Sequence, residues 1–209
     1  MTVRRHILTL NCATTHDSTR TMLHYKLILY PGLMPIAAPD TEMLVMALKN
    51  GGLIADDILN NNYPVGNAFL ALLSFLGCAP TICLSPAEGD NACQVAITPW
   101  QPCVHYLGHS NNALPRCPHC KTRLPHWQQT KNWQLGATTC ICPHCHTTTA
   151  MQHLNWKREG AYGCMAVEIT NIHPFEAVPS ENLLQILQAA TGVEWDYCYA
   201  SNAKQLTAC

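Results

Sequence analysis

Charged residues are scarce in this chain of 209 residues, at 12% of the sequence. That is about half of the share found in an ordinary globular protein. The scarcity excludes a strongly charged surface and predicts one that is neutral, polar and rich in histidine, of which there are 11. Hydrophobic residues make up 48% of the chain, so we expect it to fold around a core of its own.

Long hydrophobic runs are missing as well. The apolar run at 7–10 is shorter than the core of a secretory signal peptide, which needs about 7–15 residues. The longest apolar tract, 68–84, is broken by Ser74, Gly77 and Pro80, and a bilayer span needs roughly 18–20 residues. We therefore expect no membrane partner and a cytoplasmic location with reduced thiols. An odd number of cysteines, 13, fits that better than a closed set of disulfides.

Acidic residues are absent between Asp90 and Glu159, a stretch of 68 residues. The same stretch contains seven of the 11 histidines and four of the five tryptophans. Its basic residues are Arg116, Lys121, Arg123, Lys131, Lys157 and Arg158. The rest of the chain has six basic and 13 acidic side chains, so the stretch carries +6 and the remainder −7. This asymmetry predicts an anionic partner, either nucleic acid or an acidic protein surface.

The tetrapeptide Cys-Pro-His-Cys occurs twice within this stretch, at 117–120 and at 142–145. A C-x-x-C pair lets two sulfurs bind one metal ion from a tight turn, and a second pair completes a tetrahedral site of four sulfurs that suits Zn²⁺. The 21 residues between the pairs are a connector that a zinc-binding loop can absorb. We therefore predict one structural Zn²⁺ per chain, held by Cys117, Cys120, Cys142 and Cys145.

Two alternatives to this metal site remain open. A redox role needs each motif to open a long helix, which lowers a cysteine pKa, but Pro125 and the threonines at 147–149 disfavour helices there. Within the metal reading, Cys140 is an alternative ligand to Cys142. The nearby histidines are alternative ligands too: His119, His144 and His146.

The paired C-P-x-C motifs resemble those of the zinc-ribbon superfamily over about 30–45 residues. The resemblance implies a metal-bound ribbon with the same four cysteines as ligands. It does not imply one function, because zinc ribbons serve nucleic-acid binding, protein docking and structural support alike. The C-terminal segment 173–200 resembles bacterial proteins of unassigned activity, and that resemblance implies no function.

Outside the cysteine-rich region, the pattern predicts strands at 23–30, 81–84, 93–97, 103–108, 162–170 and 193–199. It predicts helices at 41–50, 68–76 and 181–191. The fold class is therefore α+β, a single α/β-sandwich-like domain. We predict that this main domain comprises 1–111 and 158–209, with 112–157 inserted as a zinc ribbon. The alternative, two consecutive domains, leaves a C-terminal piece that is small for a core of its own.

The predicted function is a zinc-stabilised binding or adaptor protein whose basic, acid-free ribbon faces an anionic partner. The tryptophans at 127 and 133 are either stacking platforms for bases or the small core of the ribbon. The predicted partner-binding residues are Arg116, Lys121, Arg123, Lys131, Trp127 and Trp133.

No phosphate loop, dinucleotide fingerprint or nucleophile elbow occurs in the sequence. The alternative function is an enzyme of unknown reaction with a His or Cys site in the α+β domain. The pairs Asp56–Asp57 and His173–Glu176 are candidates for it that also fit simple loops. A third possibility is a ribbon that only closes the fold or a dimer interface.

Overall fold

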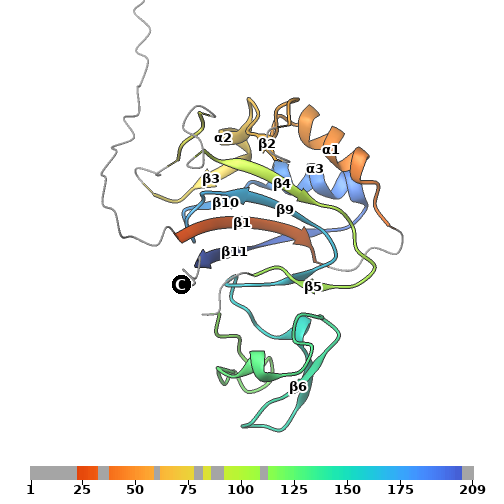
Figure 1. The fold of residues 1–209 in the computed structure, drawn as a ribbon, viewed down its shortest axis with the longest axis vertical. Helices are drawn as coiled ribbons and strands as arrows, with labels where there is room; N and C mark the ends of the chain where they lie inside the picture. The colour runs from red at the N-terminus through yellow and green to blue at the C-terminus, as the bar shows by residue number, and fades with distance from the viewer. Residues whose placement is uncertain are drawn as a thin grey trace, which may run out of the picture.

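Five antiparallel strands form the main sheet of the protein (Figure 1). The computed structural model describes residues 23–32, 38–58, 62–77, 82–85, 92–108 and 113–203. In the order of the sheet, the strands are β11 (Trp195–Ala203), β1 (Leu23–Pro31), β9 (Ala166–Thr170), β4 (Gln94–Thr98) and β2 (Tyr63–Pro64). Helices accompany this sheet, so the α+β class predicted from the sequence is confirmed.

The apolar stretch predicted as a buried strand forms β1, which pairs with β11 on one side and with β9 on the other. Its residues Leu27, Ile28 and Leu29 are completely buried. Leu27 and Leu29 belong to the main hydrophobic core, whereas Ile28 belongs to a smaller cluster. Both faces of β1 are therefore covered, which explains why its sequence is apolar without alternation.

Two helices pack against each other over one face of the sheet (Figure 1). They are α1 (Thr41–Asn50) and α3 (Glu181–Thr191). The Asp40 carboxylate accepts a hydrogen bond from the Glu42 N–H at the start of α1. The Ser180 hydroxyl accepts one from the Leu183 N–H at the start of α3. Gly192 ends α3 in the left-handed conformation, with φ 74°. The bounds predicted for both helices are confirmed.

The helix predicted at 68–76 is wrong beyond its first turn. The chain forms only α2 (Phe69–Leu72) and then continues as strand β3 (Leu73–Phe75). β3 pairs with β10 (Ala177–Pro179), and the Ser180 N–H donates to the Leu72 carbonyl oxygen. Pairing with a strand about a hundred residues away overrides a local helical preference, because propensity is a weak determinant against tertiary context.

Three strand predictions also change. Residues 82–85 form no strand, and residue 81 lies outside the described part of the chain. The strand predicted at 103–108 contracts to β5 (His105–Tyr106), and the one at 162–170 divides into β8 (Tyr162–Gly163) and β9. β5 pairs with β8 rather than with the main sheet, so the chain bends between β8 and β9 to join both.

The cysteine-rich segment, defined here as residues 113–157, lies on the other side of the sheet from the helices (Figure 1). It has little regular structure: the strands β6 (Thr139–Ile141) and β7 (Thr148–Ala150) and the 3-10 turns η2 (Trp127–Gln129) and η3 (Met151–His153). The chain enters it after β5 and leaves it before β8. Further out, β4 and β9 flank the same segment in sequence and are neighbours in the main sheet.

The division of the chain into an inserted module and a main domain stays a prediction.

None of the helices in the described ranges has the length and apolar character of a membrane span.

Candidate metal centre

The first cysteine motif forms a tight turn closed by backbone hydrogen bonds. The Lys121 N–H donates to the Cys117 carbonyl oxygen at 3.0 Å, and the Cys117 N–H donates to the Thr122 carbonyl oxygen at 2.9 Å. Lys121 adopts a left-handed conformation, with φ 64°. Because the chain reverses this sharply, the sulfurs of Cys117 and Cys120 point into the same space.

The second motif forms the same turn with two equivalent backbone hydrogen bonds. The His146 N–H donates to the Cys142 carbonyl oxygen at 2.9 Å, and the Cys142 N–H donates to the Thr147 carbonyl oxygen at 3.0 Å. His146 takes the left-handed position, with φ 58°. The duplicated sequence therefore corresponds to a duplicated structure, as a site built from two equivalent halves requires.

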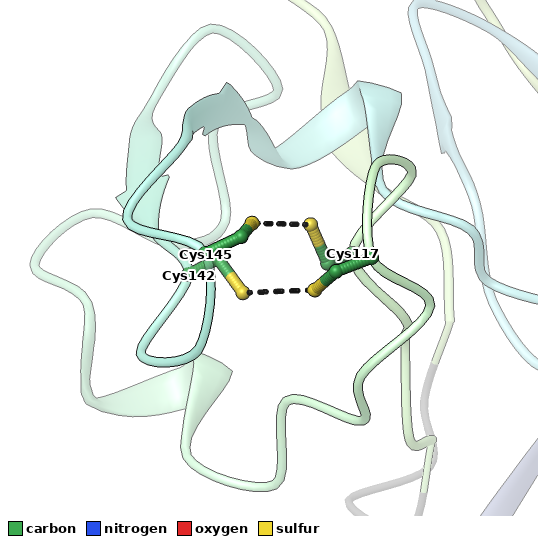
Figure 2. A group of neighbouring side chains, drawn as sticks. Cys117, Cys142 and Cys145 are labelled. Carbon is green, nitrogen blue, oxygen red and sulfur yellow. Dashed lines mark hydrogen bonds between the residues drawn. The ribbon is translucent and has the colours of Figure 1, made fainter.

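The four sulfurs of the two turns face one another (Figure 2). The Sγ atoms of Cys117 and Cys145 are 3.7 Å apart, and those of Cys120 and Cys142 are 3.6 Å apart. All four lie within 4.8 Å of one another. These separations are far longer than the disulfide bond of about 2.05 Å. A tetrahedral ion bound by sulfur at about 2.3 Å has S···S edges of about 3.8 Å. The four thiolates can therefore hold one metal ion.

Two threonine hydroxyls prepare the second cysteine of each turn for ionisation. The Sγ of Cys120 lies 3.3 Å from the Thr122 hydroxyl oxygen. The Sγ of Cys145 lies 3.4 Å from the Thr147 hydroxyl oxygen. Hydrogen bonds from the Thr122 hydroxyl and from its backbone lower the pKa of Cys120 to about 5. Those from Thr147 lower the pKa of Cys145 as well. A thiolate is the form that binds metal, so each threonine favours the ligand.

The pKa of Cys142 moves the other way, to about 11. A hydrogen bond with the backbone of Cys145 lowers this pKa. Desolvation and the neighbouring sulfurs of Cys120 and Cys145 raise it by more, so the net shift is upward. Thiolates this close to one another repel, which opposes the ionisation of all four. A cation bound between them removes that repulsion.

The two threonines were missed by the sequence analysis. The signal was present, because the repeat extends beyond Cys-Pro-His-Cys to a threonine two residues after the second cysteine of each copy. The alternative ligand Cys140 lies in β6 and is not one of the four clustered sulfurs. His119, His144 and His146 are exposed and do not belong to the group either.

A core of aromatic rings adjoins the metal centre. The ring of Tyr106 lies 5.2–5.4 Å, centroid to centroid, from those of Trp127, Trp133, Trp156 and Tyr162. Cys117 and Cys142 belong to the same buried cluster. Two of the four clustered cysteines and the aromatic side chains thus form one small core.

The Trp127 side chain lies inside this aromatic core and is 3% exposed. Its indole N–H donates to the Ala113 carbonyl oxygen at 2.8 Å. Trp133 is half-buried at the edge of the core. In this arrangement the indole face of Trp127 is covered by other rings, so of the two tryptophans predicted for stacking, Trp133 is the one that reaches the surface.

Three of the four basic residues predicted to bind a partner surround the first cysteine turn. Arg116 and Arg123 face each other across an antiparallel bridge, and the Arg116 guanidinium donates to the Lys121 carbonyl oxygen at 3.4 Å. Lys121, Arg123 and Lys131 are exposed, and Arg116 is half-buried. Lys131 comes after η2, away from this turn in the sequence. Their role toward a partner stays a prediction.

Both residue pairs considered for an enzyme lie in loops of the described structure. The His173 backbone N–H donates to the Glu176 carboxylate at 3.0 Å, which closes a loop. Asp56 and Asp57 are exposed, and Asp56 lies 3.7 Å from the Lys49 ammonium. Both pairs fit the loop interpretation.

Removing the Thr122 hydroxyl tests whether it supports a ligand. We expect Thr122→Val, which keeps the shape of the side chain, to raise the pKa of Cys120 and weaken Zn²⁺ binding about tenfold, as loss of an outer-shell partner does. Affinity would be measured by competition with a chromogenic chelator. Thr130→Val is the control, because Thr130 is half-buried as Thr122 is and has no sulfur contact among the described hydrogen bonds. Equal affinities for wild type and Thr122→Val would contradict the role given to this hydroxyl.

No protein-family model matches the chain, and no curated protein or solved structure matches it either. What the protein does must therefore follow from its own residues.

Proposed function

We propose that the protein is a zinc-stabilised binding or adaptor protein that presents a basic surface to an anionic macromolecule. The observation that carries the proposal is the cluster of four sulfurs held by two equivalent turns. Four thiolates in a tetrahedral arrangement favour Zn²⁺ over the harder cations. When bound, such an ion supplies a structural cross-link rather than an open reactive position, since all four ligand positions are occupied by protein.

In this proposal residues 112–157 are a zinc ribbon inserted into an α/β-sandwich-like main domain. Support comes from the sheet, in which β4 and β9 are neighbours although the segment separates them in the chain. The small aromatic cluster of the segment is also distinct from the main core under the helices. The aromatic cluster recruits Tyr106 and Tyr162 from the flanking β5 and β8, so the ribbon is joined to the sheet through this strand pair.

The surface proposed for the partner surrounds the first cysteine turn. Arg116, Lys121 and Arg123 lie together there, in a stretch of sequence without a carboxylate. Acidic side chains would repel an anionic partner, whereas phosphates or carboxylates are attracted. Lys131 and Trp133 extend the surface, with Trp133 available for stacking on a base. We take nucleic acid as the first candidate and an acidic protein surface as the second.

We also propose a cytoplasmic location. The described cysteines form no disulfide, although Cys93, Cys164 and Cys198 are buried and Cys103 is exposed. Thiols stay reduced in the cytoplasm, and a cluster of four thiolates needs such an environment to hold its metal.

Binding of labelled single-stranded RNA and DNA at several salt concentrations tests the partner. We expect affinity to fall as salt rises, because bound cations are released from the phosphates. The double variant Lys121→Glu/Arg123→Glu should bind more weakly, with a salt slope reduced by about two, since two phosphate contacts are lost. Lys121→Arg/Arg123→Lys keeps both charges and should bind as wild type does.

Two outcomes exclude the nucleic-acid version. One is no binding at low salt, and the other is a charge-reversed variant that binds as well as wild type. In either case the acidic protein surface becomes the proposed partner, and peptides rich in glutamate replace the nucleic acid in the same comparison.

The enzyme alternative has one observation in its favour, a cavity between the sheet and the cysteine-rich segment that is lined by titratable residues. The charged residues Arg158 and Asp196 on its wall are bound to each other at 2.7 Å. That pairing is structural and leaves no paired acid and base for catalysis at that position, so we retain the binding function.

A further inference from the structure

A cavity of about 860 Å³ lies where the cysteine-rich segment meets the main sheet. One wall comes from the sheet side, with Tyr30 of β1, Gly163 of β8 and Asp196 of β11. The other wall comes from residues 152–158. Small-molecule sites usually enclose about 300–1,000 Å³ and often lie between structural units. The cavity therefore has the size and the position of a ligand site.

The charges on the cavity wall favour an anion. Asp196 is the single carboxylate among the described residues that line it, and its Oδ1 is 2.7 Å from the Arg158 guanidinium. The guanidinium also donates to the Tyr197 carbonyl oxygen at 2.8 Å and lies 3.7 Å from the centre of the Tyr197 ring. Asp196 is thus already neutralised. Lys157, which is exposed and forms no ion pair among the described residues, leaves the cavity with a net positive charge.

The turn that carries both cations has an unusual backbone. Lys157 and Arg158 both have positive φ values, 50° and 65°. Non-glycine residues seldom adopt this conformation, and two in succession persist only where the surroundings fix them. Here the Arg158 carbonyl oxygen accepts from the Tyr199 N–H at 2.7 Å, and the Asn155 side chain accepts from the Lys157 N–H at 3.2 Å. The fold holds Lys157 at the cavity at a conformational cost.

The remaining residues that line the cavity suit the apolar part of a small organic ligand. Trp156, Leu154 and Tyr162 contribute to the wall and are only 5–6% exposed, so they are fixed by the aromatic core behind them. Val104 and Leu135 add aliphatic surface. Rigid aromatic and aliphatic walls with a few polar groups are typical of sites for small organic molecules.

We propose that this cavity binds a small organic anion whose apolar body packs on Trp156 and Leu154 and whose charged group is held by Lys157. The site goes beyond the proposed function and does not depend on it, since the macromolecular surface lies at the first cysteine turn. A ligand here contacts both the sheet and residues 152–158. It therefore binds the folded junction only and stabilises the attachment of the cysteine-rich segment.

Anilinonaphthalene sulfonate, an aromatic anion that fluoresces in apolar surroundings, is the probe. We expect saturable binding to the full, zinc-loaded chain. Lys157→Asn removes the charge with a residue that tolerates a left-handed backbone, and it should weaken binding about tenfold, as loss of a hydrogen bond to a charged group does. Lys157→Arg keeps the charge and should bind as wild type does. The uncharged analogue phenylnaphthylamine should bind wild type and Lys157→Asn equally.

A second variant locates the probe. Ala137 is exposed and lines the cavity, so Ala137→Trp adds a bulky ring at the cavity wall, away from the core, and should weaken binding. Equal affinity of wild type and Lys157→Asn for the anionic probe overturns the role of the charge. Unchanged binding to Ala137→Trp, or the absence of saturable binding to wild type, overturns the site itself. None of these results affects the nucleic-acid comparison, so the two proposals fail separately.

Discussion

Replacing Cys142 with serine is expected to abolish tight zinc binding and to unfold the cysteine-rich segment while the main sheet stays folded. The segment has only two strands of three residues and two 3-10 turns, so little of its order comes from regular structure. Structural Zn²⁺ contributes about 10–16 kcal/mol to such small units, and binding and folding are coupled. Cys142 also belongs to the aromatic cluster, so loss of the metal disturbs the core itself.

Hydrogen exchange on Cys142→Ser gives the measurement. We expect the amides of Cys117, Lys121 and His146, which close the two turns, to lose protection. The amides of β1 and β11 should keep theirs, because their side chains belong to the main core. Cys103→Ser replaces an exposed cysteine outside the cluster and should change neither zinc content nor protection.

Elemental analysis of wild type purified without added metal should give one zinc per chain, against none for the Cys142→Ser variant. If protection were lost equally at 23–31 and 195–203, the segment would have to be part of the central core. A wild-type protein without zinc, with its four cysteines oxidised in pairs, would contradict the metal site altogether.

Trp127→Ala is expected to destabilise the cysteine-rich segment by about 3–5 kcal/mol, the usual cost of emptying a buried tryptophan site. Trp127 is 3% exposed, and its ring contacts Tyr106, Trp133 and Trp156 at centroid distances of 4.8–5.2 Å. No other large side chain can move into the space without leaving its own contacts. The free energy of local opening, from hydrogen exchange of the segment, measures the loss.

Trp127→Phe distinguishes the contribution of aromatic packing from that of the indole hydrogen bond. It keeps most of the aromatic packing and loses the donor to the Ala113 carbonyl oxygen, so we expect a smaller loss than for alanine. A Trp127→Ala protein that is as stable as wild type but no longer binds nucleic acid would reverse this assignment. The indole would then act on the partner and not in the core.

The cluster of four cysteines could be predicted from the sequence because a C-x-x-C turn is a local structure. Each pair needs only its own few residues to place two sulfurs, and the repetition indicates a second half. Helix α3 was predictable for the same reason, since Ser180 and Gly192 act on the residues next to them. The fold class followed from these local elements.

The features that escaped prediction depend on residues far apart in the chain. Residues 68–76 have a helical sequence pattern, but residues 73–75 pair with β10, which lies at 177–179. The cavity is lined by residues from Tyr30 to Asp196, so no window of sequence contains it. The burial of Trp127 likewise depends on Tyr106, which precedes the cysteine-rich segment. Composition indicated that these tryptophans matter, but not which of them faces the solvent.

The position of β1 in the sheet has a consequence for synthesis on the ribosome. β1 is made before both of the strands that pair with its edges, β9 and β11. At about 5–20 residues per second, the apolar stretch around Leu27–Leu29 stays without its neighbours for on the order of ten seconds. An unpaired apolar strand can associate with other nascent chains during that time. We therefore expect slow expression at low temperature to raise the yield of folded protein.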